Sequence, residues 1–220
     1  MIEAKGITKT YQIGERAVDV LSDINLKIEK GEFVSITGPS GSGKSTLLYL
    51  LGALDSATKG EVFINGIALS GMKDKEISKH RRQQIGFIFQ FFNLVQNLTV
   101  EENILLPIVL DGKKVKNYQD KLNELLNLVG LTSVRKQKGA LLSGGEQQRV
   151  AIARALINDP VFILADEPIG NLDSVRGEEI MKLLQKINKE KGVTVVQVTH
   201  SLDSVKYGTR EIKLKDGKIV

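Results

Sequence analysis

Residues 33–45, Phe-Val-Ser-Ile-Thr-Gly-Pro-Ser-Gly-Ser-Gly-Lys-Ser, decide the fold. The apolar run 33–37 predicts a buried strand, and the apolar pattern over residues 47–54 predicts a helix after it. Between them, residues 38–45 match the G-x-x-x-x-G-K-[ST] pattern of a phosphate-binding loop, the P-loop. Its glycines let backbone N–H groups turn toward phosphates, and the helix N-terminus adds a positive dipole end. A ligand-free Gly-Ser turn is disfavoured because a strand precedes the motif and a helix follows it.

The P-loop predicts a site for a nucleotide. We expect Lys44 to bridge the β- and γ-phosphates as a catalytic group, Ser45 to bind Mg²⁺ through its hydroxyl, and Thr46 to add a phosphate contact. The expected nucleotide-binding residues of this segment are Gly38, Pro39, Ser40, Gly41, Ser42, Gly43, Lys44, Ser45 and Thr46.

Further strands and helices predict an α/β fold. Apolar runs at 85–89, 161–165 and 193–199 end at Gln90, at Asp166 and Glu167, and at His200, respectively. In an open parallel sheet, ligands bind beyond the carboxyl ends of the strands, so these side chains should meet the P-loop. Helical patterns over 116–129 and 174–191 stop at glycines, and residues 1–30 and 60–66 indicate short antiparallel strands. We therefore expect one domain over residues 1–220, with a P-loop NTPase core, a mostly parallel sheet and an N-terminal antiparallel β subdomain.

Two adjacent carboxylates suggest the chemistry. Phosphoryl transfer needs one group to organise Mg²⁺ and another to orient the attacking water, and we assign these roles to Asp166 and Glu167. His200 should contact the γ-phosphate and steady Glu167. Taken alone, an Asp-Glu pair is usually a helix cap or a solvated turn, and a lone histidine is usually an ordinary surface or core residue.

The segment Leu142–Arg149, called the signature segment below, has two explanations. Ser143 and Glu146 form a capping-box pattern before a helix predicted over 147–157. The cap does not explain Gly144 and Gly145, which lower helix propensity and suggest close approach of a ligand to the backbone. A phosphate at this helix N-terminus would satisfy that requirement. Because the P-loop already binds the phosphates of its own nucleotide, a second copy of the chain is implied.

Together these motifs resemble the ABC ATPase family over nearly the whole chain. In family order they are the P-loop, Gln90 as the Q-loop, the signature segment, Asp166-Glu167 as the Walker B end, Asn171-Leu172-Asp173 as the D-loop and His200 as the H-loop. The resemblance implies a head-to-tail dimer, with each ATP between one P-loop and Ser143, Gly144 and Gly145 of the other chain. It also implies nucleotide contacts from Glu146 and Asp173, a metal contact from Gln90, and adenine stacking on Tyr11, for which a core tyrosine is the alternative. The expected helical signature subdomain spans about 91–157.

The residues in and around these motifs resemble those of the family members that serve lipoprotein release, macrolide export and antimicrobial-peptide resistance. Ile169 and Ser201 depart from the usual threonine and aspartate. The resemblance implies an ATPase that drives a separate membrane permease. A helix over 91–95 should present an exposed phenylalanine to it, and the alternative is that Phe91 and Phe92 both fill the helical subdomain. A cell-division-type signalling module is the alternative. DNA-repair and translation proteins of the family fit poorly, since no long coiled coil and no second cassette are present.

Composition fits these expectations. The 220 residues are 41% hydrophobic, which is enough for a sizeable core, and the net charge of +5 gives little support to nucleic-acid binding. The absence of cysteine agrees with a reducing cytosol, and residues 1–6 lack the apolar core of a signal peptide. The longest apolar run, 104–110, is far shorter than the roughly 20 residues of a membrane span. We expect a cytoplasmic protein that reaches the inner face of the membrane through its partner.

Overall fold

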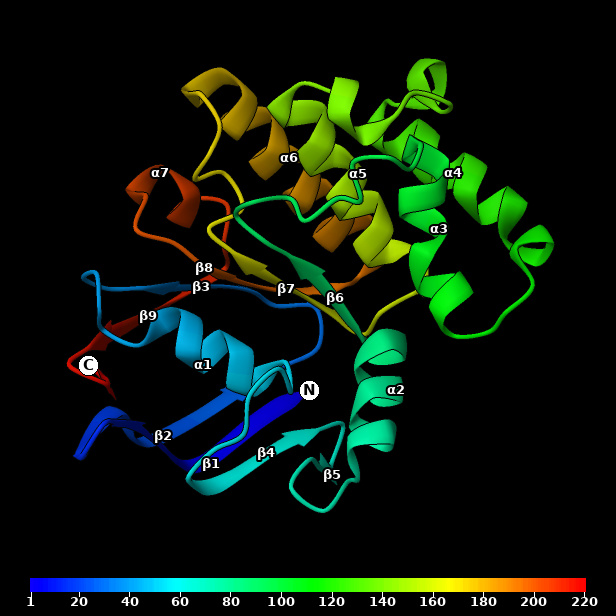
Figure 1. Cartoon of the computed structure of the whole chain (residues 1–220). Helices are drawn as coiled ribbons and strands as arrows, with labels where there is room; N and C mark the ends of the chain where they lie inside the picture. Colours follow the sequence, from blue (N-terminus) through cyan, green and yellow to red (C-terminus); the bar gives the residue numbers. More distant parts are fainter.

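The computed structural model describes all residues from 1 to 220 and has a six-stranded sheet at its centre (Figure 1). The strand order is β10-β9-β3-β8-β7-β6, and β9, β3, β8, β7 and β6 are parallel. The strands are β3 (Phe33–Thr37), β6 (Ile85–Ile88), β7 (Phe162–Asp166), β8 (Thr194–Val198), β9 (Arg210–Lys215) and β10 (Lys218–Ile219). The parallel strands expected from the apolar runs are confirmed. The sequence pattern missed β9 because this strand buries only alternate residues and so has no continuous apolar run.

A second sheet is antiparallel and has the order β2-β1-β4-β5. Its strands are β1 (Ile2–Ile13), β2 (Arg16–Ile28), β4 (Lys59–Ile64) and β5 (Ile67–Ala68), so the predicted pairing is confirmed but β1 and β2 are long. Helix α1 (Lys44–Leu51) lies between the two sheets (Figure 1). It packs into one apolar core with β1, β2 and the near face of β3, which anchors the P-loop helix on both sides.

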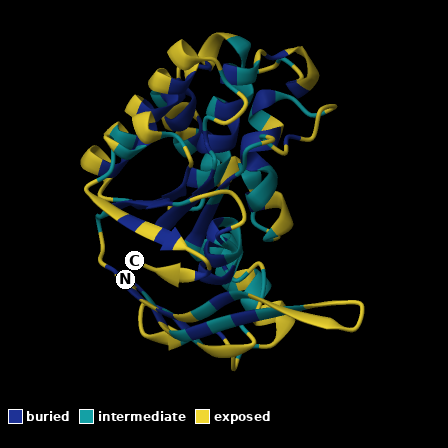
Figure 2. Ribbon diagram, turned by 90° about the vertical axis from the view of Figure 1, so that its left-hand side faces the viewer, coloured by how far each residue is buried: buried dark blue, intermediate teal, exposed yellow.

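Helices cover the other face of the central sheet. They are α3 (Val100–Leu110), α4 (Gln119–Val129), α5 (Gly144–Leu156) and α6 (Ser174–Lys191), and they share a second apolar core with the sheet. The central strands are buried between these layers (Figure 2). Gly130 and Gly192 end α4 and α6 with left-handed φ values of 71° and 63°, as predicted. Helix α5 begins at Gly144, earlier than the predicted Gln147.

The remaining helices are α2 (Asp74–Gln84), α7 (Leu202–Val205) and short 3₁₀ turns at 115–118, 132–134 and 139–141. None of the helices is long and apolar enough to cross a bilayer.

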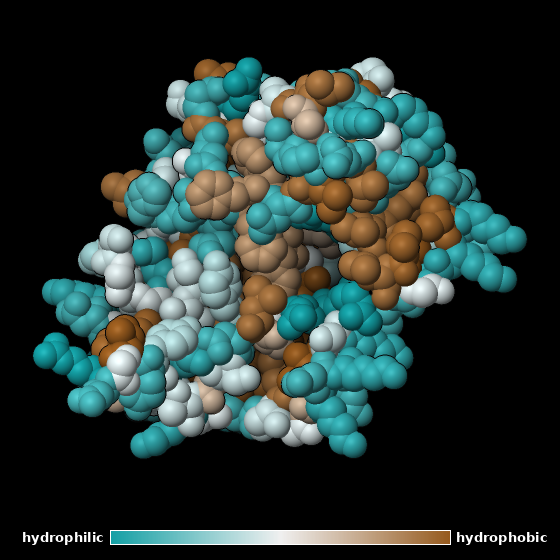
Figure 3. All heavy atoms as spheres, viewed as in Figure 1, coloured by the Kyte–Doolittle hydropathy of each residue, from teal (hydrophilic) through white to brown (hydrophobic).

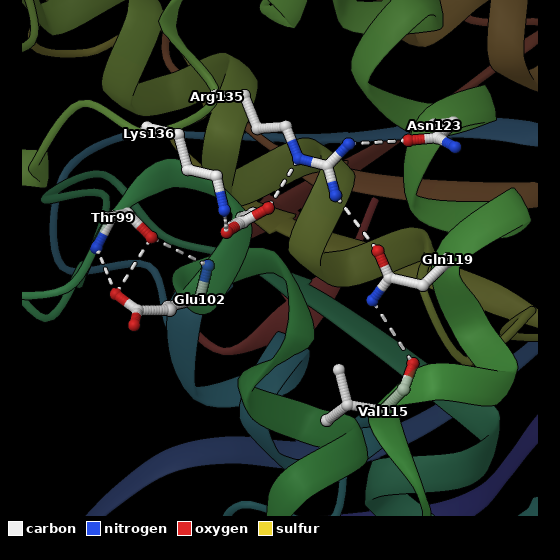
Figure 4. Close-up of polar contacts among 8 residues, drawn as sticks. Thr99, Glu102, Val115, Gln119, Asn123, Arg135 and Lys136 are labelled. Atoms are coloured by element: carbon white, nitrogen blue, oxygen red, sulfur yellow. Dashed lines mark hydrogen bonds and ion pairs between the residues drawn. The ribbon is translucent and has the colours of Figure 1, made fainter.

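An ion-pair network joins the helices of this second core (Figure 4). Glu101 on α3 pairs with Arg135 and with Lys136. The guanidinium of Arg135 also donates to Asn123 Oδ1 at 2.8 Å and to Gln119 Oε1 at 3.0 Å, both on α4. Burial raises the pKa of Glu101, but the hydrogen bonds from Lys136 and Arg135 outweigh it and hold the pKa below its usual range.

The segment after Gln90 corrects one prediction, because residues 91–95 form a turn and not a helix. Phe92 and Asn93 both have positive φ, at 56° and 50°, which a right-handed helix does not allow. Arg154 on α5 donates to the carbonyl oxygens of both residues and so stabilises the turn. Phe91 is 73% exposed, whereas Phe92 packs against the second core.

Candidate nucleotide site

The P-loop joins β3 to α1, and its glycines have steric causes. At Gly38, whose φ is 153°, a Cβ would lie 2.0 Å from the carbonyl oxygen of Leu214. At Gly43, whose φ is 95°, it would lie 2.8 Å from the carbonyl oxygen of Val20. The loop borders a hollow of about 320 Å³ lined by Val20, Ser40, Gly41, Gly43, Lys44, Ser45, Thr46 and Glu167.

Polar groups inside the loop suit an anion. Lys44 is 9% exposed, and its Nζ donates to the carbonyl oxygens of Gly38 and Pro39 at 2.9 and 2.8 Å. No carboxylate pairs with this ammonium, so a buried positive charge is left without a counter-charge. The hydroxyl of Ser42 is also buried and has no hydrogen-bond partner. Phosphate oxygens would satisfy both groups.

Asp166, at the end of β7, accepts hydrogen bonds from two hydroxyl groups of α1. Ser45 Oγ donates to Oδ1 at 2.9 Å, and the hydroxyl of Tyr49 donates to Oδ2 at 2.7 Å. Burial and the hydrogen bond to Asp166 raise the pKa of Tyr49 to about 12. The paired oxygens of Ser45 and Asp166 fit Mg²⁺, which prefers oxygen ligands. Sequence reasoning missed Tyr49, although it lies one helical turn after Ser45 and therefore on the same face.

Glu167 and His200 lie together at the ends of neighbouring strands, as predicted. Glu167 Oε1 accepts a hydrogen bond from the His200 backbone N–H at 3.1 Å and lies 2.8 Å from His200 Nδ1. Glu167 has a left-handed φ of 48°, and its N–H donates to the Val198 carbonyl. Besides the P-loop hollow, Glu167 lines a second hollow of about 370 Å³ that contains His200 and Asp173. The structure thus brings the P-loop, Asp166, Glu167 and His200 together.

The signature segment does not line either hollow. Ser143 and Glu146 form the predicted capping box, and the hydrogen bonds from Ser143 lower the pKa of Glu146. A Cβ at Gly144 would lie 3.4 Å from Leu172 Cδ2, and one at Gly145 would lie 3.3 Å from Arg176 Cδ, which gives both glycines close neighbours within the chain.

Asp173 and Gln90 have contacts within the chain. Asp173 is the N-cap of α6, with its carboxylate accepting from the Arg176 N–H at 2.9 Å. The side chain of Gln90 lies beside Gly170, where a Cβ would come within 2.8 Å of Gln90 Nε2. The Gln90 carbonyl accepts from Asn171 Nδ2 at 2.8 Å.

Tyr11 is partly buried, and its contacts are polar. Its hydroxyl donates to Asp55 Oδ2 at 2.6 Å, and Lys9 Nζ lies 4.7 Å from the centre of its ring. Lys9 in turn pairs with Asp55 at 2.7 Å. These contacts fix the ring and cover one of its faces with an ammonium group. Sequence reasoning missed Lys9 and Asp55, since neither belongs to a recognisable motif.

The family of the chain follows from its comparison with known proteins. The family model described as ABC transporter matches residues 21–170, and the chain therefore belongs to this family. An ABC transporter ATP-binding protein of Methanocaldococcus jannaschii, MJ0796, is 48% identical over 100% of this chain and 95% of the relative. The dimeric structure of MJ0796 in a post-hydrolysis state with ADP and Pi matches with a TM-score of 0.90 over 100% of this chain and 96% of that one. The chain is thus an ATP-binding subunit with the fold of an ABC ATPase.

Two other relatives are named for their roles. The lipoprotein-releasing system ATP-binding protein LolD of Aquifex aeolicus is 47% identical over 100% of this chain and 96% of its own length. The macrolide export ATP-binding/permease protein MacB of Bdellovibrio bacteriovorus is 48% identical over 100% of this chain but only 33% of its own length. Both agree with the subfamily expected from the motifs.

Proposed function

We propose that this chain hydrolyses Mg-ATP in a head-to-tail dimer and drives a separate membrane permease. The observation that carries the proposal is the arrangement around Asp166 and Glu167. Ser45 reaches Asp166, and His200 reaches Glu167, at the edge of the sheet where the P-loop begins its helix. This arrangement supplies an anion site, a pair of oxygen ligands and a carboxylate beside a histidine, which are the groups phosphoryl transfer requires.

In the proposed mechanism, the P-loop N–H groups and Lys44 bind the β- and γ-phosphates of ATP. Lys44 exchanges its two carbonyl partners for phosphate oxygens, a stronger charge-assisted contact. Ser45 and Asp166, with Gln90, would hold Mg²⁺, which when bound neutralises charge on the phosphates. Glu167 orients the attacking water and accepts its proton. His200 holds the Glu167 carboxylate through two contacts, and with ATP bound it would contact the γ-phosphate.

The dimer is supported by the position of the signature segment. Ser143, Gly144, Gly145 and Glu146 lie at the N-terminus of α5, outside the hollows around Glu167. We infer that a second copy presents its own segment to complete the ATP site. Asp173 then lies near the shared boundary, and Tyr11 stacks on the adenine. The dimeric MJ0796 structure, with ADP and Pi, is consistent with this arrangement.

A hollow of about 350 Å³ is the proposed permease site. Its apolar lining includes Leu54, Phe87, Phe89, Leu106, Pro107 and Leu110, and Figure 3 shows apolar side chains gathered over α3 and the end of β6. Phe91, with 73% of its surface exposed, lies on the turn after Gln90, and Asn93 of the same turn lines the hollow. We place the hollow between the core and the helical subdomain of residues 91–157. The permease would hold the chain at the inner face of the membrane.

The relatives named for macrolide export and for lipoprotein release support export or lipoprotein release as the driven process. Peptide resistance rests on the motif resemblance alone. The test of the ATPase assignment is Lys44→Ala beside the control Lys116→Ala, which changes an exposed lysine without an ion pair. We expect Mg-dependent ATP hydrolysis to be lost in Lys44→Ala and retained in Lys116→Ala. Equal hydrolysis by both variants would contradict the proposed site. Co-purification of the tagged chain with a membrane protein tests the permease.

A further inference from the structure

Tyr49 makes a contact that no motif of the chain accounts for. It lies in the interior of α1, one turn after Ser45, and both hydroxyl groups face the same carboxylate. Ser45 occupies Oδ1 of Asp166 at 2.9 Å, and Tyr49 occupies Oδ2 at 2.7 Å. Asp166 is 9% exposed and has no ion pair in the chain. Its two oxygens are therefore held by two hydroxyl donors of one helix.

This pairing fixes the direction of the carboxylate. A carboxylate with one hydrogen-bonded oxygen can still rotate about its Cβ–Cγ bond, whereas donors on both oxygens define its plane. The Tyr49 backbone is itself anchored, because its carbonyl oxygen accepts from the Leu54 N–H at 2.9 Å at the end of α1. The ring also packs against the apolar core around α1, so contacts other than Asp166 help to position it.

We propose that Tyr49 is a positioning residue for the metal site. Its hydroxyl holds Oδ2 so that Oδ1 stays directed toward Ser45 and toward the Mg²⁺ that these two residues would share. The inference rests on the proposed Mg-ATP site. Partners of this kind around a metal ligand typically contribute about tenfold to a hundredfold to metal affinity.

The experiment compares Tyr49→Phe with the control Tyr118→Phe, which removes a tyrosine hydroxyl from the 3₁₀ turn at 115–118, outside both hollows of the proposed site. Mn²⁺ replaces Mg²⁺ as a paramagnetic probe, and its binding to the ADP-bound chain is titrated by electron paramagnetic resonance. ADP affinity without metal is measured in parallel with a fluorescent ADP analogue. We expect Tyr49→Phe to weaken Mn²⁺ binding by about tenfold or more, with metal-free ADP binding unchanged and the control like the parent chain.

Mn²⁺ affinity of Tyr49→Phe within about twofold of the parent would overturn the inference, as would an equal loss of metal-free ADP binding, which a merely structural role predicts. Asp166→Asn distinguishes a failure of the proposed metal site from a failure of the role proposed for Tyr49. If Asp166→Asn also leaves Mn²⁺ binding intact, the proposed metal site itself is wrong. If Asp166→Asn abolishes Mn²⁺ binding while Tyr49→Phe retains it, the metal site holds and only the role of Tyr49 is refuted.

Discussion

Replacing Glu167 with Gln changes one charge at the proposed catalytic centre and little else. The left-handed φ of 48° is equally accessible to Gln, and the backbone bond to Val198 is kept. Gln also keeps a carbonyl oxygen that accepts from the His200 N–H. Binding of ATP through Lys44 and Ser45 should therefore survive the substitution.

The rate is expected to fall because an amide cannot accept the proton of the attacking water. A positioned general base typically raises the rate by about 10²–10⁴-fold, so the hydrolysis rate should fall by that factor. This corresponds to an increase of about 3–5 kcal/mol in the activation free energy. Bound ATP then persists for correspondingly longer. In the proposed dimer the γ-phosphate is shared between the P-loop of one chain and the signature segment of the other, so the closed dimer should accumulate.

The assay combines single-turnover hydrolysis with size-exclusion chromatography and light scattering. Glu167→Gln should run as a dimer with ATP and as a monomer with ADP, whereas Glu190→Gln, on an exposed part of α6 outside both hollows, should hydrolyse ATP like the parent chain. Adding Gly144→Asp should abolish the dimer through charge and bulk beside Leu172. A Glu167→Gln chain that stays monomeric at saturating ATP, at both low and high salt, would refute the shared site but not the P-loop assignment.

Three further outcomes are expected. Tyr11→Ala should weaken ATP binding by about 1 kcal/mol in a calorimetric titration while the single-turnover rate stays nearly constant; unchanged affinity would rule out stacking. Phe91→Ser should spare the ATPase activity of the isolated chain but lose the membrane partner in a pull-down, and retained assembly would exclude this contact. Glu101→Gln should lower the free energy of unfolding by about 1 kcal/mol at neutral pH. Because folding lowers the pKa of Glu101, its contribution is present above about pH 4.3 and is lost as the pH falls through the folded pKa, so the two chains should converge in acid; a constant difference would contradict the pKa shift.

The fold was predictable where burial leaves a simple pattern. Strands buried on both faces, such as β3 and β7, read as continuous apolar runs, and helices α4 and α6 end at glycines with left-handed φ. The turn after Gln90 was not predictable in this way. Its shape depends on Arg154, which comes from α5 and satisfies two carbonyl groups of the turn. The sequence around Gln90 alone does not predict this contact, because Arg154 lies far away in the sequence.

The residues of the proposed site also differ in how far the sequence predicts them. The P-loop, Asp166, Glu167 and His200 were predictable because each follows a buried strand, and a parallel sheet brings such positions to one edge. Tyr49, Lys9 and Asp55 were not, because their hydrogen bonds join segments whose distance in space depends on packing.

Contacts between helices and loops also connect the proposed permease site to Glu167. Gln148 on α5 donates to the carbonyl of Pro168, the residue directly after Glu167, and Arg154 on the same helix binds the turn after Gln90. That turn is linked in the other direction as well, since Asn171 donates to the Gln90 carbonyl. The loop that follows Glu167 is thus hydrogen-bonded both to α5 and to the turn beside the permease hollow. In the proposed complex, a partner that displaces the turn would break these bonds or move the loop with it, so we expect the geometry of Glu167 to respond to occupancy of the hollow.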